Sequence, residues 1–585
     1  MKYNTSMGGG GQRKSKLNFQ NPQFKEKLFT IFFIAFLCIY LLNIAIFPNF
    51  GVIDDHIVIS TLAKGEFIPL FILPSIGRFY PLDAMDLNII YAIFGLNINA
   101  IYIFTAIFAL ITALCLFFGL KIILDSVLDS TNLTHSNSNP NLTHQNLTQN
   151  AQDSTFQNST LLAMIAITLF MLTPAFATAF LRLFVPEKLE SVFFAIFIFT
   201  FIKFSFKNSN FYFLIALISG SLALYFKEVA FIMLGSFAFF HLIFSAINDK
   251  MPLFKPTKPK ILDLALILSC VVWVVLYFIF VILEKTNSGR YGDTPYSALL
   301  VFAKSAINYA LSEPFLFIGI FVLALFRIFC VSVKKERINP FLDSCILASA
   351  LHSLAYLALN IYSFHYPLPA YIFALFPLAY YFRKYWGNLA IKGVFGLCVV
   401  IFILNSLPAF IYQFNHYKAV PNNYQATLSF LDSYIKENPH TNIYLDGVNR
   451  ASSGEVYHSF IKNLEFKGLK DFDFYSDLGI DNEILGKENP NSPYAVFKSN
   501  EKVPKKPGDL VVITPYMTFN IDENYIKNHN YELLFESKWG LNIPLLGIKS
   551  ALKSMVSQSN PSLVLSQNIY ALPIHFSVYR VKGER

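Results

Sequence analysis

Long apolar runs recur over the first 412 residues of the chain. A helix that crosses the hydrocarbon core of a membrane needs about 20 mostly apolar residues, and it satisfies all its backbone hydrogen bonds internally. Only 14% of the 585 residues are charged, against roughly 25% in soluble domains, and 54% are hydrophobic. These values exclude a soluble globular protein and predict an α-helical polytopic membrane protein. Eleven segments are candidate spans: approximately 28–48, 99–123, 160–181, 189–205, 210–226, 229–248, 261–283, 314–333, 341–362, 367–382 and 388–412.

Basic residues between the spans predict the orientation, because Lys and Arg accumulate in cytoplasmic loops. Residues 1–27 form a basic N-terminus that we expect in the cytoplasm. Eleven spans then place the clusters at 203–207, 250–260, 334–337 and 383–384 on the same side. The basic residues form no continuous stripe, so the net charge of +9 does not indicate a nucleic-acid partner.

Three regions interrupt this pattern. Within the membrane domain, predicted over 28–412, residues 49–98 form a long external loop and residues 125–159 a polar, low-complexity cytoplasmic insert. From 413 to 585 the charges increase and the apolar runs shorten to strand length. Strands at Asn442–Leu445 and Leu510–Thr514, helical stretches near 424–437 and 454–464, and strand-like runs near 563–582 predict a small extracytoplasmic α/β domain.

Two adjacent acids, Asp54 and Asp55, follow the first span directly. Partial burial at the membrane boundary tunes the pKa of a carboxyl group, and an ionised carboxylate there can take a proton from an acceptor hydroxyl. The alternative is that these acids only end a helix at the membrane surface.

Further polar residues lie in the predicted external turns, each with a structural alternative. Arg78 is a candidate for holding a phosphate or an interfacial anchor, and Glu187 is a candidate partner for a metal or an acceptor, or an acid that complements a helix dipole. The adjacent Lys227 and Glu228 interrupt an otherwise unbroken apolar stretch, which favours a phosphate contact over a simple turn. The other candidates are Arg290 for phosphate, and His365 and Tyr366 for phosphate or a sugar hydroxyl or as part of an aromatic belt.

Taken together, these motifs resemble the GT-C superfamily of membrane glycosyltransferases, which use polyprenyl-phosphate sugars. The resemblance covers roughly residues 28–412 and rests on the acids after the first span, Gly77-Arg78-Phe79-Tyr80-Pro81, Pro186-Glu187, Lys227-Glu228 and His365-Tyr366-Pro367-Leu368-Pro369. It implies that Asp54 or Asp55 is the catalytic carboxylate and that Arg78, Lys227 and Arg290 hold the carrier phosphate. It implies no certain cofactor and leaves a divalent metal open, since the second loop offers Glu187 and Glu190 but no clear Asp.

The resemblance thus implies sugar transfer from a polyprenyl-phosphate carrier to a lipid, glycan or protein acceptor, and the residue usage, rich in Asn, Lys, Ile and Phe, favours the outer face of a bacterial inner membrane. One acid with a good leaving group favours inversion at the anomeric carbon. A transporter or flippase of lipid-linked saccharides is the alternative, but we find no internal repeat and the candidate charges gather on one face. A scaffold that binds glycan without catalysis is a third interpretation.

Overall fold

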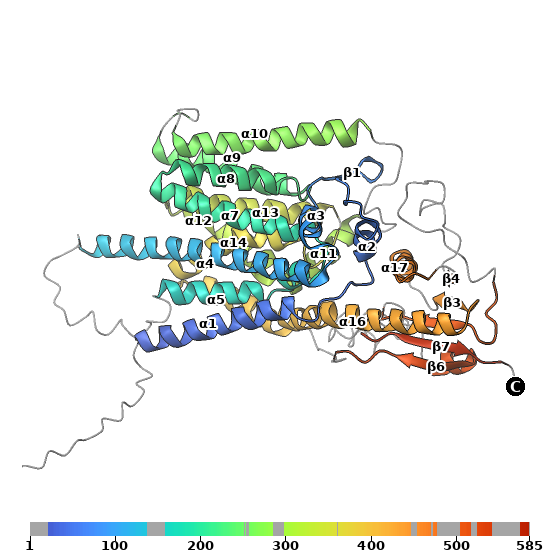
Figure 1. Cartoon of the computed structure of the whole chain (residues 1–585). Coiled ribbons are helices and arrows are strands. Elements are labelled where there is room, and N and C mark those ends of the chain that lie inside the picture. The colour runs from blue at the N-terminus through green and yellow to red at the C-terminus, as the bar shows by residue number, and fades with distance from the viewer. Residues whose placement is uncertain are drawn as a thin grey trace, which may run out of the picture.

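The computed structural model describes residues 22–136, 158–250, 252, 257–284, 298–359, 361–445, 453–469, 472–476, 503–515, 523–540 and 574–583. Long helices lie side by side in a bundle, and a small sheet stands at one end of it (Figure 1). The long helices of the bundle are α1 (Pro22–Ala45), α4 (Ile98–Ser136), α5 (Ser159–Met171), α6 (Pro174–Leu181), α7 (Pro186–Lys207), α8 (Asn210–Ala223), α9 (Ala230–Asp249), α10 (Lys258–Tyr277), α11 (Ala298–Ser312), α12 (Phe321–Ser332), α13 (Pro340–Ala358), α14 (Leu368–Lys384), α15 (Leu389–Ile401) and α16 (Leu407–Glu437).

Eight helical segments in the described part of the chain are long and apolar enough to cross a membrane, or nine if the bent pair α5–α6 is one span. The predicted polytopic helical fold is therefore confirmed, and all eleven predicted spans are helical. The count differs because α8 has 14 residues and α14 has 17, which is short for the hydrocarbon core. Short π-helical turns at Phe278–Ile282, Phe315–Ile320 and Phe402–Ser406 continue α10, precede α12 and join α15 to α16.

Local sequence signals set the helix ends. Proline stands in the first turn of α6, α7 and α13, where its missing N–H costs no hydrogen bond. The side chains of Asn158, Thr173 and Asn339 accept hydrogen bonds from the free N–H groups that follow them. The bend of 63° between α5 and α6 falls at Thr173 and Pro174, where one helix stops and the next begins.

The loop after α1 is folded rather than extended. It holds α2 (Asp55–Leu62), an antiparallel hairpin of β1 (Phe71–Leu73) and β2 (Arg78–Tyr80), and α3 (Met85–Phe94). Phe71 pairs with Tyr80, and Gly77 takes the left-handed conformation that the tight connection requires. Because α1 leads into this loop and α4 leaves it, we call this end of the bundle the loop end.

The C-terminal region forms a mixed five-stranded sheet in the order β4-β3-β5-β7-β6. Its strands are β3 (Asn442–Leu445), β4 (Asp473–Ser476), β5 (Leu510–Ile513), β6 (Tyr531–Glu536) and β7 (Ser577–Val581), with the helices α17 (Ser453–Phe466) and α18 (Glu523–Asn528). Strand β3 runs parallel to β4 and β5, and β7 runs antiparallel to β5 and β6. The predicted C-terminal α/β fold is confirmed, and β3 and β5 lie where the sequence places strands.

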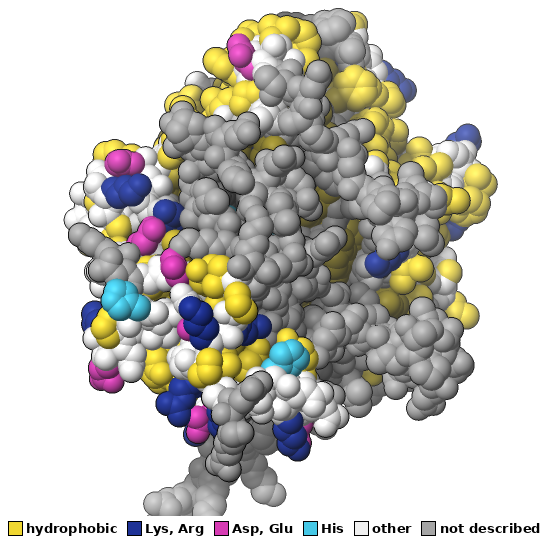
Figure 2. Space-filling view, turned by 90° about the vertical axis from the view of Figure 1, so that its right-hand side faces the viewer, with side chains coloured by type: hydrophobic (Ala, Val, Ile, Leu, Met, Phe, Trp, Pro, Cys, Tyr) yellow, Lys and Arg dark blue, Asp and Glu magenta, His cyan; other side chains and the backbone are white. Residues whose placement is uncertain are grey.

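Helix α16 connects the bundle to the sheet. It continues through residue 413, where the sequence places the start of the soluble domain, so the division into 28–412 and 413–585 stays a prediction. The buried side chain of Asn423 donates to the carbonyl oxygens of Trp539 and Ile574 and accepts from Trp539 N, all at 2.8 Å. The surface at the sheet end carries Lys, Arg, Asp and Glu side chains of both signs, interspersed rather than gathered in one patch (Figure 2).

Candidate functional site

The two acids after α1 lie at the start of α2 but in different surroundings. Asp54 precedes the helix with φ 67°, and its side chain forms an ion pair with Arg182, the residue that ends α6. Asp55 is the first residue of α2 and only 6% exposed, and its Oδ2 accepts a hydrogen bond from Gly51 N at 2.5 Å. The bend before α2 therefore turns one carboxylate towards an arginine and the other into the protein.

Asp55 and Arg182 line the same cavity of about 230 Å³. Its wall combines the segment before α2 and its first residue, the start of α4, the end of α6 and one face of α16: Gly51, Val52, Ile53, Asp55, Tyr102, Leu181, Arg182, Leu183, His416, Tyr417, Val420 and Pro421. Burial raises the pKa of the Asp55 carboxyl to about 7, and the neighbouring Asp54 raises it further while Gly51 N–H and Arg182 oppose the shift. A carboxyl group with this pKa can both accept and release a proton near neutral pH.

A second polar cluster joins four of the predicted external turns. Arg78 Nε lies 2.7 Å from Glu228 Oε1, which also accepts from Phe79 N, and Lys227 Nζ lies 3.0 Å from Glu187 Oε1. Both cations also face an aromatic ring: the Arg78 guanidinium lies over Tyr80, and the Lys227 ammonium over Tyr366. The sequence predicts that Arg78 and Lys227 bind phosphate. In the structure each of them also has a carboxylate partner.

His365 completes this cluster, since its Nε2 lies 3.7 Å from Glu187 Oε2. Burial lowers the pKa of His365 to about 3, although Glu187 acts in the opposite direction, so the imidazole is neutral at pH 7. For Lys227, burial lowers the pKa, but the ion pair with Glu187 outweighs it and raises the pKa above its ordinary value. The ammonium group therefore stays charged although it is buried.

Lys188 connects the two clusters. It pairs with Asp86 of α3 at 3.2 Å and donates to the carbonyl oxygen of Leu183, which lines the Asp55 cavity. Next to this pair, burial and then the charge of Asp86 raise the pKa of the Asp83 carboxyl well above its ordinary value. Acids and bases from distant turns thus form one buried polar layer at the loop end.

The structure brings together Asp54, Asp55, Arg78, Glu187, Lys227, Glu228, His365 and Tyr366, eight of the nine predicted site residues. The ninth, Arg290, lies outside the described residues. Sequence reasoning missed Arg182, Lys188 and Asp86 as members of the site. The available signal was the position of Arg182 and Lys188 on either side of the turn that contains Glu187.

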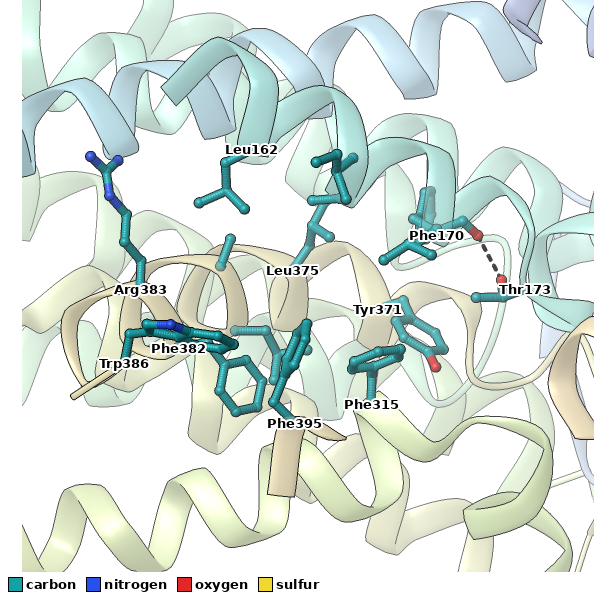
Figure 3. Close-up of a pocket in the computed structure, with 15 residues that line it drawn as sticks. Leu162, Phe170, Thr173, Phe315, Tyr371, Leu375, Phe382, Arg383, Trp386 and Phe395 are labelled. Atoms are coloured by element: carbon teal, nitrogen blue, oxygen red, sulfur yellow. Dashed lines mark hydrogen bonds between the residues drawn. The ribbon is translucent and has the colours of Figure 1, made fainter. Parts of the chain in front are cut away.

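Two further cavities open beside the α5–α6 pair. One, of about 190 Å³, lies between α5 and α14 and is almost wholly apolar, with Thr173 and Tyr371 towards one end and Arg383 and Trp386 at the other (Figure 3). The other, of about 520 Å³, lies between α1 and α16 and includes Phe36, Phe414, Lys418 and Trp539 in its lining. Both fit a hydrocarbon chain better than a polar ligand.

We searched the described residues for side chains that could bind a metal ion. No group of three or more His, Cys, Asp or Glu side chains is arranged there to hold a metal ion. In the polar layer the carboxylates of Asp54, Asp86, Glu187 and Glu228 are each within 3.2 Å of a Lys or Arg nitrogen.

Helices of membrane-spanning length and a buried acid beside an arginine at one bundle end define the class of this chain, a multi-spanning membrane protein with a polar site at its loop end. No family model matches the chain, and no curated protein matches it. Among solved structures it is similar to ArnT from Cupriavidus metallidurans bound to undecaprenyl phosphate, with 12% identity and a TM-score of 0.42 over 87% of this chain and 97% of that chain. It is also similar to the archaeal oligosaccharyltransferase AglB from Archaeoglobus fulgidus in complex with an inhibitory peptide and a dolichol-phosphate, with 12% identity and a TM-score of 0.37 over 95% of this chain and 89% of that chain. Because both likenesses are distant, the proposed function rests on the residues of the site.

Proposed function

We propose that this protein is a glycosyltransferase of the GT-C type that moves a sugar from a polyprenyl-phosphate carrier to an acceptor hydroxyl at the loop end. One observation carries the proposal: Asp55, a buried acid with a pKa of about 7, and Arg182, a cation, line one cavity at the end of membrane-spanning helices. A base for the acceptor and a positive charge for the phosphate are the two groups that such a transfer needs.

In the proposed reaction Asp55 is the general base and Arg182 holds the carrier phosphate. The acceptor oxygen attacks the anomeric carbon as its proton passes to the Asp55 carboxylate. The bond between the anomeric carbon and the phosphate oxygen breaks, and the polyprenyl phosphate leaves with its negative charge facing the Arg182 guanidinium. Asp54 positions Arg182, while Lys227 and Arg78 form ion pairs with Glu187 and Glu228 in the neighbouring cluster.

Inversion at the anomeric carbon fits the lining of this cavity. Retention by double displacement needs a second carboxylate about 5 Å from the first to act as nucleophile. Among the described residues that line the cavity, Asp55 is the one carboxylate, and the neighbouring Asp54 is held in an ion pair with Arg182. A single displacement is therefore the mechanism that the site supports.

The cavities beside α5 and α6 suggest where the lipid lies. The larger cavity lies on the same helix α16 as the Asp55 cavity, with Asn415 and Lys418 lining the first and His416 and Tyr417 the second, so a prenyl chain there would lie beside the Arg182 site. We propose that the loop end faces the outside of a bacterial inner membrane, with residues 1–27 in the cytoplasm and the sheet of 413–585 in the periplasm. The Lys and Arg clusters at the opposite end support this orientation.

The test measures polyprenyl phosphate released by the purified full-length protein in lipid nanodiscs, since this product is common to every donor sugar and acceptor. Panels of polyprenyl-phosphate sugars and of envelope lipid acceptors supply the substrates. We expect Asp55→Asn to slow release by about 100-fold or more, the usual contribution of a general base. Glu66→Gln, an exposed acid in the same loop, is the matched control and should keep the full rate. Full activity of Asp55→Asn would contradict the assignment.

A further inference from the structure

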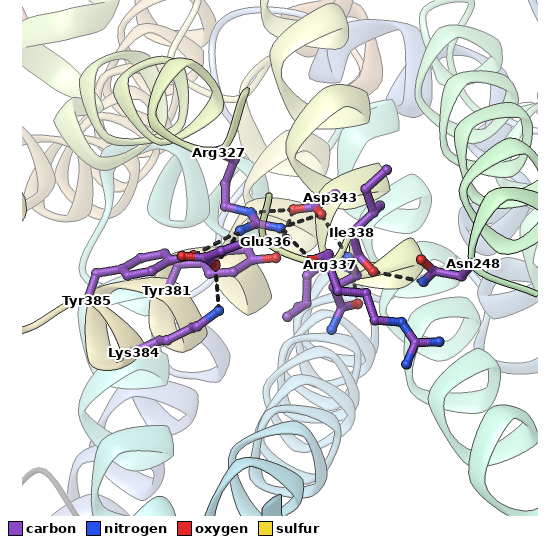
Figure 4. Close-up of polar contacts among 11 residues, drawn as sticks. Asn248, Arg327, Glu336, Arg337, Ile338, Asp343, Tyr381, Lys384 and Tyr385 are labelled. Carbon is purple, nitrogen blue, oxygen red and sulfur yellow. Dashed lines mark hydrogen bonds and ion pairs between the residues drawn. The ribbon is translucent and has the colours of Figure 1, made fainter. Parts of the chain in front are cut away.

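A second polar pocket, of about 530 Å³, lies at the opposite end of the bundle (Figure 4). Its lining comes from the end of α9, the α12–α13 connection and the end of α14: Asn248, Arg327, Glu336, Arg337, Ile338, Asn339, Pro340, Tyr380, Tyr381 and Lys384. Helix α13 starts here at Pro340 and reaches the loop end at Ala358, and its 19 residues rise about 28 Å. This pocket is therefore separate from the Asp55 cavity.

Arg327 is the centre of a fully paired network in this pocket. Its Nε and Nη2 contact the two oxygens of Asp343 at 2.9 and 2.8 Å, and its Nη1 contacts Glu336 at 3.2 Å. Lys384 Nζ also lies 2.8 Å from Glu336. The two carboxylates are thus neutralised by Arg327 and Lys384, although Arg327 is only 4% exposed.

Arg337 adds a positive charge that this network does not need. Its backbone oxygen accepts from Arg327, but its side chain is exposed and forms no ion pair with a described residue. Figure 4 shows its guanidinium pointing away from the Arg327 network. The three cations of the lining face Glu336 within it and Asp343 behind Arg327, which leaves a net charge of +1, and Lys334 and Lys335 belong to the same connection. An anion is the complementary ligand.

The surroundings of this pocket are those of a lipid–water interface. Helix α12 leads into the pocket with a strip of exposed apolar side chains, among them Leu325, Ile328, Phe329 and Val333. Lys334 lies over the rings of Phe326 and Phe329, at 5.8 to 5.9 Å, as a lysine at a lipid–water interface does. These contacts indicate that the pocket lies at the level of lipid head groups, whose phosphates are anions.

We infer that this pocket binds the phosphate of an anionic phospholipid head group, with Arg337 as the principal contact and Lys384 as the second. Basic pockets between membrane helices at the positively charged end of a protein are typical sites for such lipids. The inference does not depend on the proposed glycosyl transfer, because the two sites lie at opposite ends of the bundle.

The test counts the lipids retained by the full-length protein after extraction from vesicles of equal parts phosphatidylglycerol and phosphatidylcholine. Mass spectrometry of the washed protein gives the number of phosphatidylglycerol and of phosphatidylcholine molecules that each protein molecule retains. We expect Arg337→Gln to retain about tenfold less phosphatidylglycerol, the effect of losing one charge-assisted hydrogen bond to the phosphate, with unchanged phosphatidylcholine. Lys384→Gln should act in the same direction. Lys207→Gln removes the same charge at the same end but outside the pocket, and should match the wild type.

Three results would overturn the inference. Unchanged phosphatidylglycerol in both pocket variants would show that the lipid binds elsewhere. An equal loss in Lys207→Gln would show a general electrostatic effect of this membrane face. Displacement of the lipid by inorganic phosphate in the wash would identify a site for free phosphate instead. Equal melting temperatures of all variants in phosphatidylcholine alone exclude misfolding as the cause of a loss.

Discussion

Asp54 and Asp55 show how neighbouring side chains of the same type acquire different chemistry. The backbone of Asp54, with φ 67°, directs its carboxylate to Arg182, while the first turn of α2 buries Asp55 against Gly51. Two neighbouring carboxyl groups in different surroundings are typical of acid–base sites. The pair therefore divides the work, with Asp55 available for the proton and Asp54 holding the arginine.

The proposed role of Asp55 predicts a pH-dependent rate. The base must be ionised, and its pKa is about 7, so kcat/KM should rise from pH 5, reach half its maximum near pH 7 and level off above pH 8. Asp54→Asn removes a negative charge that raises the pKa of Asp55, so the half-maximum should move to lower pH in this variant. The measurement is the initial rate of polyprenyl phosphate release from pH 5 to 9. A flat profile in the wild type would show that Asp55 is not the base.

Arg182 predicts a change in donor binding. Arg182→Gln should raise the KM for the polyprenyl-phosphate donor by about 10- to 100-fold, because a hydrogen bond to a charged group contributes about 1.5 to 3 kcal/mol. Arg182→Lys should recover part of this loss, since lysine keeps the charge but not the planar fork. The double variant Arg182→Gln/Asp54→Asn controls for an unpaired Asp54, and it should keep the high KM. An unchanged KM in all three variants would assign the phosphate to another cation.

The candidate site was predictable from the sequence as a list of residues but not as a set of pairs. A charged residue in an apolar stretch is conspicuous in the sequence, and this criterion alone identifies Asp54, Asp55, Lys227 and Glu228. Their partners depend on how distant turns meet: Asp54 and Arg182 are 128 residues apart, and Arg78 and Glu228 are 150 apart. No local pattern contains that information.

Among the helices and strands, the length of the apolar runs predicted the membrane spans. It did not predict the shorter elements between them. Helix α11 lies in the stretch 284–313, which the sequence indicates as a loop, because its 15 residues are too few for a span. The hairpin β1–β2 lies within the long external loop predicted over 49–98. Its strands have three residues each, and Tyr80 stacks on Phe71 across the hairpin. This contact depends on the register of the two strands, which the sequence does not give.

Asn423 predicts how firmly α16 is attached to the sheet. Asn423→Ala removes three buried hydrogen bonds and leaves the backbone groups of Trp539 and Ile574 unpaired, so we expect a loss of about 3 kcal/mol in the stability of this junction. A lower melting temperature followed by tryptophan fluorescence is the measurement. Asn438→Ala, which removes an exposed hydrogen bond on the same helix, should leave the melting temperature unchanged. Equal stability of both variants would show that other contacts hold the sheet.

In the whole molecule, the two ends of the bundle carry different polar chemistry. The loop end holds acids and bases in a buried layer under a folded loop, and the opposite end holds the Arg327 network and most of the lysine clusters. The charge pattern of the sequence predicted this asymmetry, since Lys and Arg fall at alternate turns. It did not predict the cavities, because each one is lined by helices that are far apart in the chain.

The groove between α5 and α14 gives the last prediction, which concerns the prenyl chain. Ala166 lines this groove, and a tryptophan there would fill much of its roughly 190 Å³. If the chain lies in the groove, Ala166→Trp should raise the KM for a long polyprenyl donor by about tenfold or more, since each buried CH₂ contributes about 0.8 kcal/mol. A donor with one or two isoprene units does not reach the groove, so its KM should stay the same in this variant. An unchanged KM for both donors in Ala166→Trp would place the chain between α1 and α16 instead.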